Sequence, residues 1–212
     1  MIKVVEFFKR RPDLAPEAFL AHWQERHTPI VLGINGLRRY VQNPVMGLAG
    51  LPTAGFDGVV EAWFDSLETM RDNGRSAYWP VVVEDERRFI DRDSRQLILT
   101  ASVDPPLIEP GPKLMLLINK EADCSVAEFQ QRLHGGLGAM AGCVGLQACN
   151  CDLPIASSYD KPRRLAGDAV VSLRFATWRD AEGVLATPAY TALLADAART
   201  MCLAVDERVI KQ

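Results

Sequence analysis

The chain has 212 residues, of which 48% are hydrophobic and 24% charged, and its formal net charge is −3. This composition is typical of a globular protein with one large or two small cores and argues against disorder. The acidic balance disfavours a nucleic-acid partner, no apolar run is long enough to cross a membrane, and the charged first residues do not predict a secretory signal, so the cytoplasm is the expected location.

The first half of the chain predicts strand, helix, strand, long loop, strand, two helices and a closing strand. Period-two and period-3.6 hydrophobic patterns set these assignments, and Gly, Pro and capping residues set their ends. The expected elements are a strand at 2–9, a helix from Pro16 to about Val31, a strand at 37–42 after the Asn35-Gly36 turn, a loop at 43–56, a strand at 57–64, a short helix capped by Ser66, a helix ending near Phe89 and a strand at 95–101.

The second half repeats the pattern of the first. "KVVEFFKR" at 3–10 corresponds to "KLMLLINK" at 113–120, an offset of 110 residues. "FDGVVEAWFDS" in the first half corresponds to "GDAVVSLRFAT" in the second, at an offset of 111 residues. Ser125 with Glu128 predicts a capping box, and Thr187 before Pro188 predicts another helix start. The segment between the halves, "SVDPPLIEPGP", is too rich in proline for regular structure. We therefore expect repeat 1 at 1–101, a linker at 102–112 and repeat 2 at 113–212.

The repeated order of elements predicts the fold class. A βαββαβ unit of about 100 residues is ferredoxin-like, with helices on one face of an antiparallel sheet. The other sheet face needs a cover, and two such sheets in one chain can cover each other. The sequence predicts an α+β protein in which two ferredoxin-like repeats pack as an intrachain dimeric α/β barrel around a cavity.

The five cysteines all lie in the second half. An odd number, in a chain without an export signal, favours free thiols over a disulfide framework. "CNCD" at 149–152 lacks a second pair of ligands at a suitable spacing, so no metal site is predicted.

Alternation along the strand at 57–64 separates a helix-facing set from a cavity-facing set. The first set is wholly apolar and comprises Gly58, Val60, Ala62 and Phe64. The second is mixed, which favours a lined pocket or, alternatively, ion pairs at the ends of a barrel. It comprises Asp57, Val59, Glu61 and Trp63, with Arg174 among the counterparts in repeat 2. Glu6 could face the same way, and Tyr40 shares one face of its strand with Gln42.

His27 stands on an apolar helical stripe with Phe19, Trp23 and Ile30, where repeat 2 has a leucine. An imidazole in this place needs a hydrogen-bond partner, for which Glu61 is one candidate. Three roles remain open: a structural histidine, a general acid or base, and a metal or haem ligand. His22, five positions earlier, is about 500° away around an α-helix and is expected to point elsewhere.

These residues also resemble the EthD family of the dimeric α/β-barrel superfamily. The resemblance rests on "DLAPEAFLAHWQERHTPIV", "NGLRRYVQN", "FDGVVEAWFDSLE" and "EDERRFIDRDS", which together span about 90 residues of repeat 1 in the family's order. Repeat 2 is more weakly similar and lacks the W-x-x-x-H motif. The resemblance implies a ferredoxin-like fold paired into a barrel and a small hydrophobic or aromatic ligand, and it does not fix a reaction.

The function we predict is that of a cofactor-independent enzyme that moves a proton on a small aromatic or polyketide-like molecule. In this hypothesis His27 is the acid or base, Glu61 orients it and Tyr40 donates a hydrogen bond. Candidate substrate-binding residues are Trp23, Trp63, Trp79, Arg174, Glu6 and Asp57. The alternatives are a non-enzymatic binding or accessory protein and a haem protein or monooxygenase with His27 as the axial ligand. Homodimerisation is left open.

Overall fold

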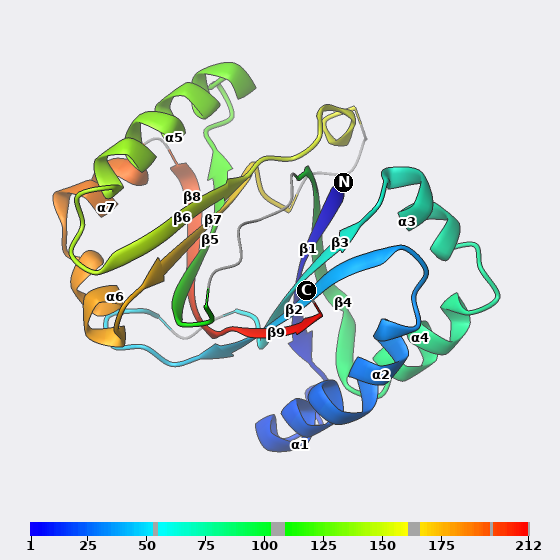
Figure 1. Ribbon diagram of the computed structural model, residues 1–212. Helices are drawn as coiled ribbons and strands as arrows, with labels where there is room; N and C mark the ends of the chain where they lie inside the picture. Colours follow the sequence, from blue (N-terminus) through cyan, green and yellow to red (C-terminus); the bar gives the residue numbers. More distant parts are fainter. Residues whose placement is uncertain (53–54, 103–108, 161–165, 196, 212) are drawn as a thin grey trace. The chain divides into compact units, whose positions relative to one another are not determined.

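The computed structural model describes residues 1–52, 55–102, 109–160, 166–195 and 197–211, which form a mixed α+β protein (Figure 1). The chain divides into two compact units. Each unit is an antiparallel sheet with helices on one of its faces. Among the described residues, no helix is both long and apolar enough to cross a membrane.

The first unit has the strand order β4-β1-β3-β2, and β9 lies beside β2. Three consecutive helices, the middle one a π-helix, connect β1 to β2. The elements are β1 (Ile2–Arg10), α1 (Pro16–Ala21), the π-helix η1 (His22–His27), α2 (Thr28–Leu32), β2 (Leu37–Met46), β3 (Gly58–Phe64), α3 (Leu67–Asn73), α4 (Trp79–Glu86), β4 (Ile90–Ala101) and β9 (Arg208–Lys211).

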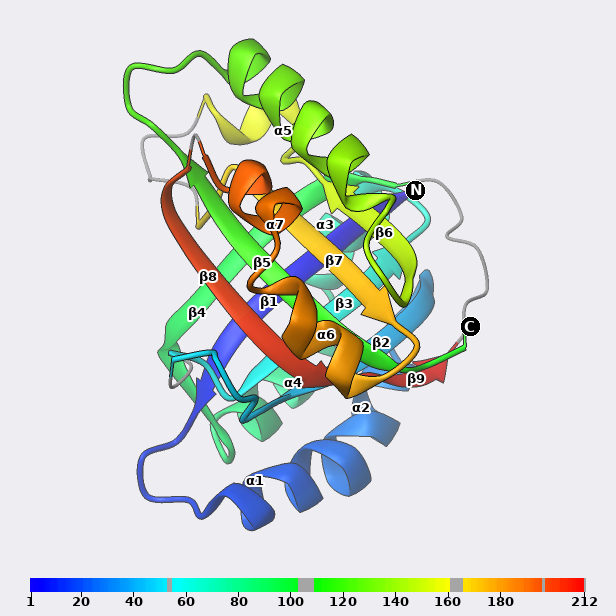
Figure 2. The same ribbon diagram turned by 90° about the vertical axis from the view of Figure 1, so that its left-hand side faces the viewer.

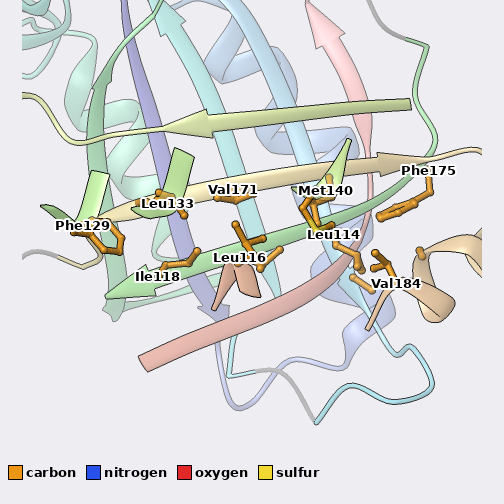
Figure 3. Packing of buried hydrophobic residues seen from close by; sticks show 14 residues of the cluster. Leu114, Leu116, Ile118, Phe129, Leu133, Met140, Val171, Phe175 and Val184 are labelled. Atoms are coloured by element: carbon orange, nitrogen blue, oxygen red, sulfur yellow. The ribbon is translucent and has the colours of Figure 1, made fainter. Parts of the chain in front are cut away.

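The second unit has the strand order β8-β5-β7-β6. Figure 2 shows α6 and α7 lying over this sheet. Its core forms where the apolar side of β5 meets α5, with Leu114, Leu116 and Ile118 close to Phe129 and Leu133 (Figure 3). The elements are β5 (Pro112–Lys120), α5 (Val126–Met140), β6 (Leu146–Asp152), a 3-10 turn (Ala156–Ser158), β7 (Ala169–Phe175), α6 (Trp178–Val184), α7 (Pro188–Leu193) and β8 (Ala197–Asp206).

The compact units differ from the sequence repeats in two segments. β9 follows β8 in the chain, yet it pairs with β2 in the first unit, where Val209 is opposite Val41. Conversely, the end of β2 pairs with β8 in the second unit, where Val45 is opposite Val205. The repeat boundaries at 1–101, 102–112 and 113–212 stay a prediction, and most of the linker lies outside the described residues.

The helix-facing side of the first sheet is the one predicted from alternation. A Cβ added to Gly58 would lie 2.8 Å from the Trp23 ring and 2.9 Å from the Phe8 ring, so this glycine admits the helix layer close to the strand. Val60 packs against the same aromatic cluster. Since side chains alternate along a strand, Glu61 and Trp63 belong to the opposite face.

The predicted helix starts are confirmed. The Ser66 hydroxyl accepts a hydrogen bond from the Thr69 amide at 3.0 Å. Ser125 and Glu128 form both bonds of a capping box. The Thr187 hydroxyl accepts from the Tyr190 amide, directly before Pro188. These local signals need only a few neighbouring residues, which is why the sequence alone identifies them.

Candidate functional site

The site begins with the π-helix at His22–His27, inside the segment predicted as one α-helix. π-Helical turns are rare and occur frequently at functional sites. Here the Trp23 carbonyl accepts hydrogen bonds from the Thr28 hydroxyl at 3.3 Å and the Gln42 amide at 3.1 Å. The same Gln42 nitrogen lies 3.0 Å from the Thr28 hydroxyl. Gln42 is fully buried, so a side chain on β2 ties the π-helix to the sheet.

Both histidines of this π-helix contact one carboxylate. His27 Nδ1 lies 2.8 Å from Asp85 Oδ2, and His22 Nε2 lies 3.0 Å from Asp85 Oδ1. The prediction that His22 points away from His27 is therefore wrong. It assumed 3.6 residues per turn, whereas i→i+5 bonding places residues five apart nearly above one another.

The His27 ring is held in a defined state. Its residue is 5% exposed, and its ring centroid lies 4.8 Å from that of Phe89. Burial lowers the pKa of His27, and this effect outweighs the hydrogen bond and charge of Asp85, which act in the opposite direction. A carboxylate only accepts hydrogen bonds, so Nδ1 carries the proton of the neutral ring and Nε2 carries the lone pair.

Tyr40 and Trp23 lie on the same side of the sheet as His27. Trp23 Nε1 donates to the Tyr40 hydroxyl at 3.3 Å, and both residues are buried. Burial raises the pKa of Tyr40 to about 12, so its hydroxyl keeps its proton near neutral pH. Rings of Phe8, Phe19 and Phe89 surround Trp23 and form an apolar cluster. The arrangement combines a base, a hydrogen-bond donor and aromatic rings.

A chain of charges lies beside Tyr40 and His27. Glu6 on β1 forms an ion pair with Arg95, and Arg95 Nη1 lies 3.0 Å from Glu86 Oε2. Arg92 Nε lies 3.4 Å from the same Glu86 oxygen. Burial raises the pKa of Glu86, partly against the charge of Arg95. Arg92 also lines a surface pocket of about 420 Å³, which brings this chain of charges to solvent.

Glu61 and Trp63 are on the other face of the sheet. The Glu61 carboxylate lies 2.7 Å from Lys3 Nζ and accepts from the Asn43 amide at 3.1 Å. Lys3 also lies 4.7 Å from the centroid of the Trp63 ring. The structure thus gives Glu61 a lysine partner, and the carboxylate that contacts His27 is Asp85.

The remaining predicted residues are dispersed. Asp57 accepts from the Arg10 backbone amide at 3.0 Å, at the end of the sheet. Trp79 begins α4, at the opposite end of that helix from Asp85. Arg174, in the second unit, donates to Glu207 Oε2 at 2.8 Å. Of the candidates, His27, Tyr40, Trp23 and Glu6 share one side of the first sheet.

Asp85 is the functional residue that the sequence reasoning missed. On α4 and the turn after it, Val82, Asp85, Glu86 and Phe89 recur at helical spacing and are all buried. Two carboxylates on an otherwise apolar helical stripe require partners. This pattern is the sequence signal that could have identified Asp85. Arg95 and Gln42 gave no comparable signal, because neither stands on an apolar helical stripe.

The described residues contain no group of three or more His, Cys, Asp or Glu side chains that could hold a metal ion. His22 and His27 contact different oxygens of Asp85. The cysteines are free, and burial raises the pKa of Cys149 to about 11 and of Cys151 to about 12. These two thiols stay protonated near neutral pH, and thiolates are the form that binds metals.

Comparison with known proteins gives a domain match in the first half of the chain and a fold. The sequence model of the EthD domain matches residues 11–93, the segment that holds both histidines and Asp85. An anthrone oxidase-like protein superposes with a TM-score of 0.69 at 14% identity, covering 100% of this chain and 94% of its own. No curated protein sequence matches the chain.

Two further structures have the same fold. A protein from Lactobacillus acidophilus NCFM with a provisional monooxygenase label has a TM-score of 0.54 at 12% identity, covering 100% of this chain and 96% of its own. A chlorite dismutase variant from Candidatus Nitrospira defluvii has a TM-score of 0.55 at 11% identity, covering 96% and 90%. At such identities the likeness concerns the fold alone, and it confirms the predicted class: α+β, with ferredoxin-like repeats of the dimeric α/β-barrel type.

Proposed function

Because the EthD domain model matches residues 11–93, we propose that this protein is an enzyme that moves a proton on a small aromatic or polyketide-like substrate. The reaction classes that this covers are decarboxylation, dehydration, cyclisation and isomerisation. One observation carries the proposal: a buried carboxylate, Asp85, holds His27 Nδ1 at 2.8 Å and leaves Nε2 as the basic nitrogen. Asp85 takes the orienting role that the sequence had suggested for Glu61.

The base is unprotonated near neutral pH, because the pKa of His27 is lowered. A neutral imidazole can accept a proton at Nε2, and the Asp85 carboxylate then stabilises the imidazolium that forms. The lowered pKa of His27 keeps the ring neutral before the substrate is bound. Positioned groups of this kind contribute roughly 10²- to 10⁴-fold in rate.

Tyr40 supplies the complementary group. Its hydroxyl accepts the Trp23 indole N–H and retains its own proton, which it can donate to a carbonyl or enolate oxygen. A developing oxyanion is stabilised by such a fixed donor in a site without water. The rings of Trp23, Phe8 and Phe19 favour an aromatic or other apolar substrate body.

Haem is the cofactor that the family resemblance raised, and His27 does not fit the role of its axial ligand. An axial imidazole must present one ring nitrogen to an open face that admits the porphyrin. The His27 residue is 5% exposed and its ring contacts Phe89, which leaves less open face than a porphyrin needs. A titration of the purified protein with haem tests this directly, and we expect no Soret shift.

The test of the proposal is turnover of a panel of aromatic keto acids, followed by product analysis. We expect His27→Gln to lower kcat at least 100-fold, with substrate affinity changed only a few-fold. His134→Gln is the matched control, because His134 is exposed and its Nδ1 lies 2.8 Å from the Gln130 carbonyl of its own helix. If no panel member turns over and His27→Ala binds ligands as the unmodified protein does, the protein is a binding or accessory protein and the proposal fails.

A further inference from the structure

The second histidine has no role in the proposed reaction, and its placement calls for one. His22 stacks on Phe89 with centroids 4.9 Å apart and an interplanar angle of 22°. Its side chain is 12% exposed against 6% for His27. The two rings therefore share one carboxylate and one aromatic neighbour but differ in access to water.

The charges around the two rings do not balance without one added proton in the cluster. Glu6 and Glu86 form ion pairs with Arg95 and Arg92, so these four charges balance. Asp85 instead contacts the two histidines and adds one negative charge beside them. This leaves an excess of one negative charge in a buried cluster. Burying an uncompensated charge is costly, so the cluster favours one added proton.

That proton can stand on three groups: His22, His27 or Glu86. Desolvation penalises the charged form more strongly at the more buried ring, which is His27. A positive charge on Arg95 also disfavours a charged His27. His22 is the more exposed imidazole, and through Asp85 Oδ1 it is in direct contact with a negative charge at 3.0 Å.

We propose that His22 is a positioning residue whose imidazole carries the positive charge that balances Asp85, and that His27 consequently stays neutral with Nε2 available as a base. This inference rests on the proposed function for its purpose, since it explains how His27 remains unprotonated beside a carboxylate. The charge assignment itself does not depend on any substrate.

Solution NMR of the full chain labelled with ¹⁵N at histidine tests the assignment without turnover. The chain has three histidines, so the spectrum is simple, and the exposed His134 is an internal reference. Ring nitrogen shifts distinguish the charged ring from each neutral tautomer. At about pH 6 we expect a charged His22 and a His27 that is neutral and protonated at Nδ1. A charged His27 beside a neutral His22 would overturn the proposal.

Two variants of His22 separate its charge from its contacts. His22→Gln can still donate to Asp85 but has no charge, and His22→Phe keeps the stacking on Phe89 without the donor. In both we expect the titration midpoint of His27 to rise by at least one pH unit, which is tenfold in proton affinity. An unchanged midpoint in His22→Gln would show that His22 does not control His27.

Glu86→Gln decides between His22 and Glu86 as the site of the proton. If His22 carries it, removing one carboxylate charge removes the need for it, and His22 becomes neutral at about pH 6. If Glu86 is already protonated, the glutamine changes neither ring, and the proposal fails. Glu84→Gln is the matched control, because Glu84 lies on the same helix with a side chain that is 59% exposed. Failure of the proposed enzyme activity would leave all of these readings unchanged.

Discussion

His27 Nδ1 lies 2.8 Å from Asp85 Oδ2, although 58 positions separate the two residues in the chain. The contact joins the π-helix to α4, and both partners are buried. A buried histidine with a buried carboxylate at one nitrogen has a fixed orientation and a fixed tautomer. Most of the chemistry proposed above depends on this pair, and it is the first target for mutation.

Asp85→Asn should lower kcat at least 100-fold in the keto acid assay, because the amide can donate to His27 Nδ1 and favours the tautomer with its lone pair on the wrong nitrogen. The ¹⁵N spectrum should show that tautomer change directly. Glu84→Gln, one position earlier and on the surface, should leave both rate and tautomer unchanged. Equal activity of Asp85→Asn and the unmodified protein would remove His27 from the mechanism.

Gln42→Leu should destabilise the π-helix. The substitution removes the amide that donates to the Trp23 carbonyl and contacts the Thr28 hydroxyl, and it should lower the free energy of unfolding by about 1 kcal/mol. Hydrogen exchange of the backbone amides at 22–28 should become faster. Gln147→Leu, at an exposed position of β6, provides the comparison and should change neither quantity.

Much of the fold could be predicted from local patterns. The apolar set at Gly58, Val60, Ala62 and Phe64 needs only the period of a strand, and the caps at Ser66, Ser125 and Thr187 need only neighbouring residues. The candidate site was harder to predict from the sequence, because its contacts join distant segments of the chain. His27 stood out as a polar residue on an apolar stripe, but Glu61, suggested as its partner, lies on the opposite face of the sheet, where alternation had placed it.

The π-helix explains the other failure. Nothing in "HWQERH" distinguishes it from an ordinary α-helical segment. The hydrogen bond to its Trp23 carbonyl is donated by Gln42, which lies on β2. One extra residue per hydrogen-bonded turn rotates the ring of His22 toward Asp85. A sequence pattern that assumes one helical period throughout cannot represent such a change.

Gly58→Ala should lower the free energy of unfolding by about 1–3 kcal/mol, since the new methyl group would overlap the rings of Trp23 and Phe8. Denaturant unfolding measures this. Gly138→Ala is the opposite case: it lies within α5, and a Cβ there meets nothing within 4 Å, so it should stabilise the protein by about 0.5–1 kcal/mol. Equal effects of the two substitutions would contradict the close approach at Gly58.

Glu207 should make the protein sensitive to acid. Burial alone would raise the pKa of Glu207, but the hydrogen bond from Arg174 and the charges of Lys113 and Arg174 outweigh it, and the pKa lies below its usual range. A carboxylate of this kind stabilises the fold above its unfolded pKa, and the stabilisation is lost as the pH falls from about 4.5 through the folded value.

Glu207→Gln should therefore cost about 3–5 kcal/mol at pH 7, where two buried cations lose a shared carboxylate, and much less near pH 3. Urea unfolding of both proteins at pH 3, 5 and 7 measures the difference. Glu182→Gln, on an exposed position of α6, should have a similar small effect at every pH. A cost for Glu207→Gln that does not change with pH would argue against the lowered pKa.

Two strand pairings affect whether the halves of the chain can be expressed separately: β9 pairs with β2, and the end of β2 pairs with β8. A chain cut at the proline-rich linker would give two polypeptides, each lacking a strand that completes its own sheet. Each fragment expressed alone would then expose an unpaired strand edge, which is a known aggregation hazard. The two fragments would need to be expressed together for each sheet to be completed.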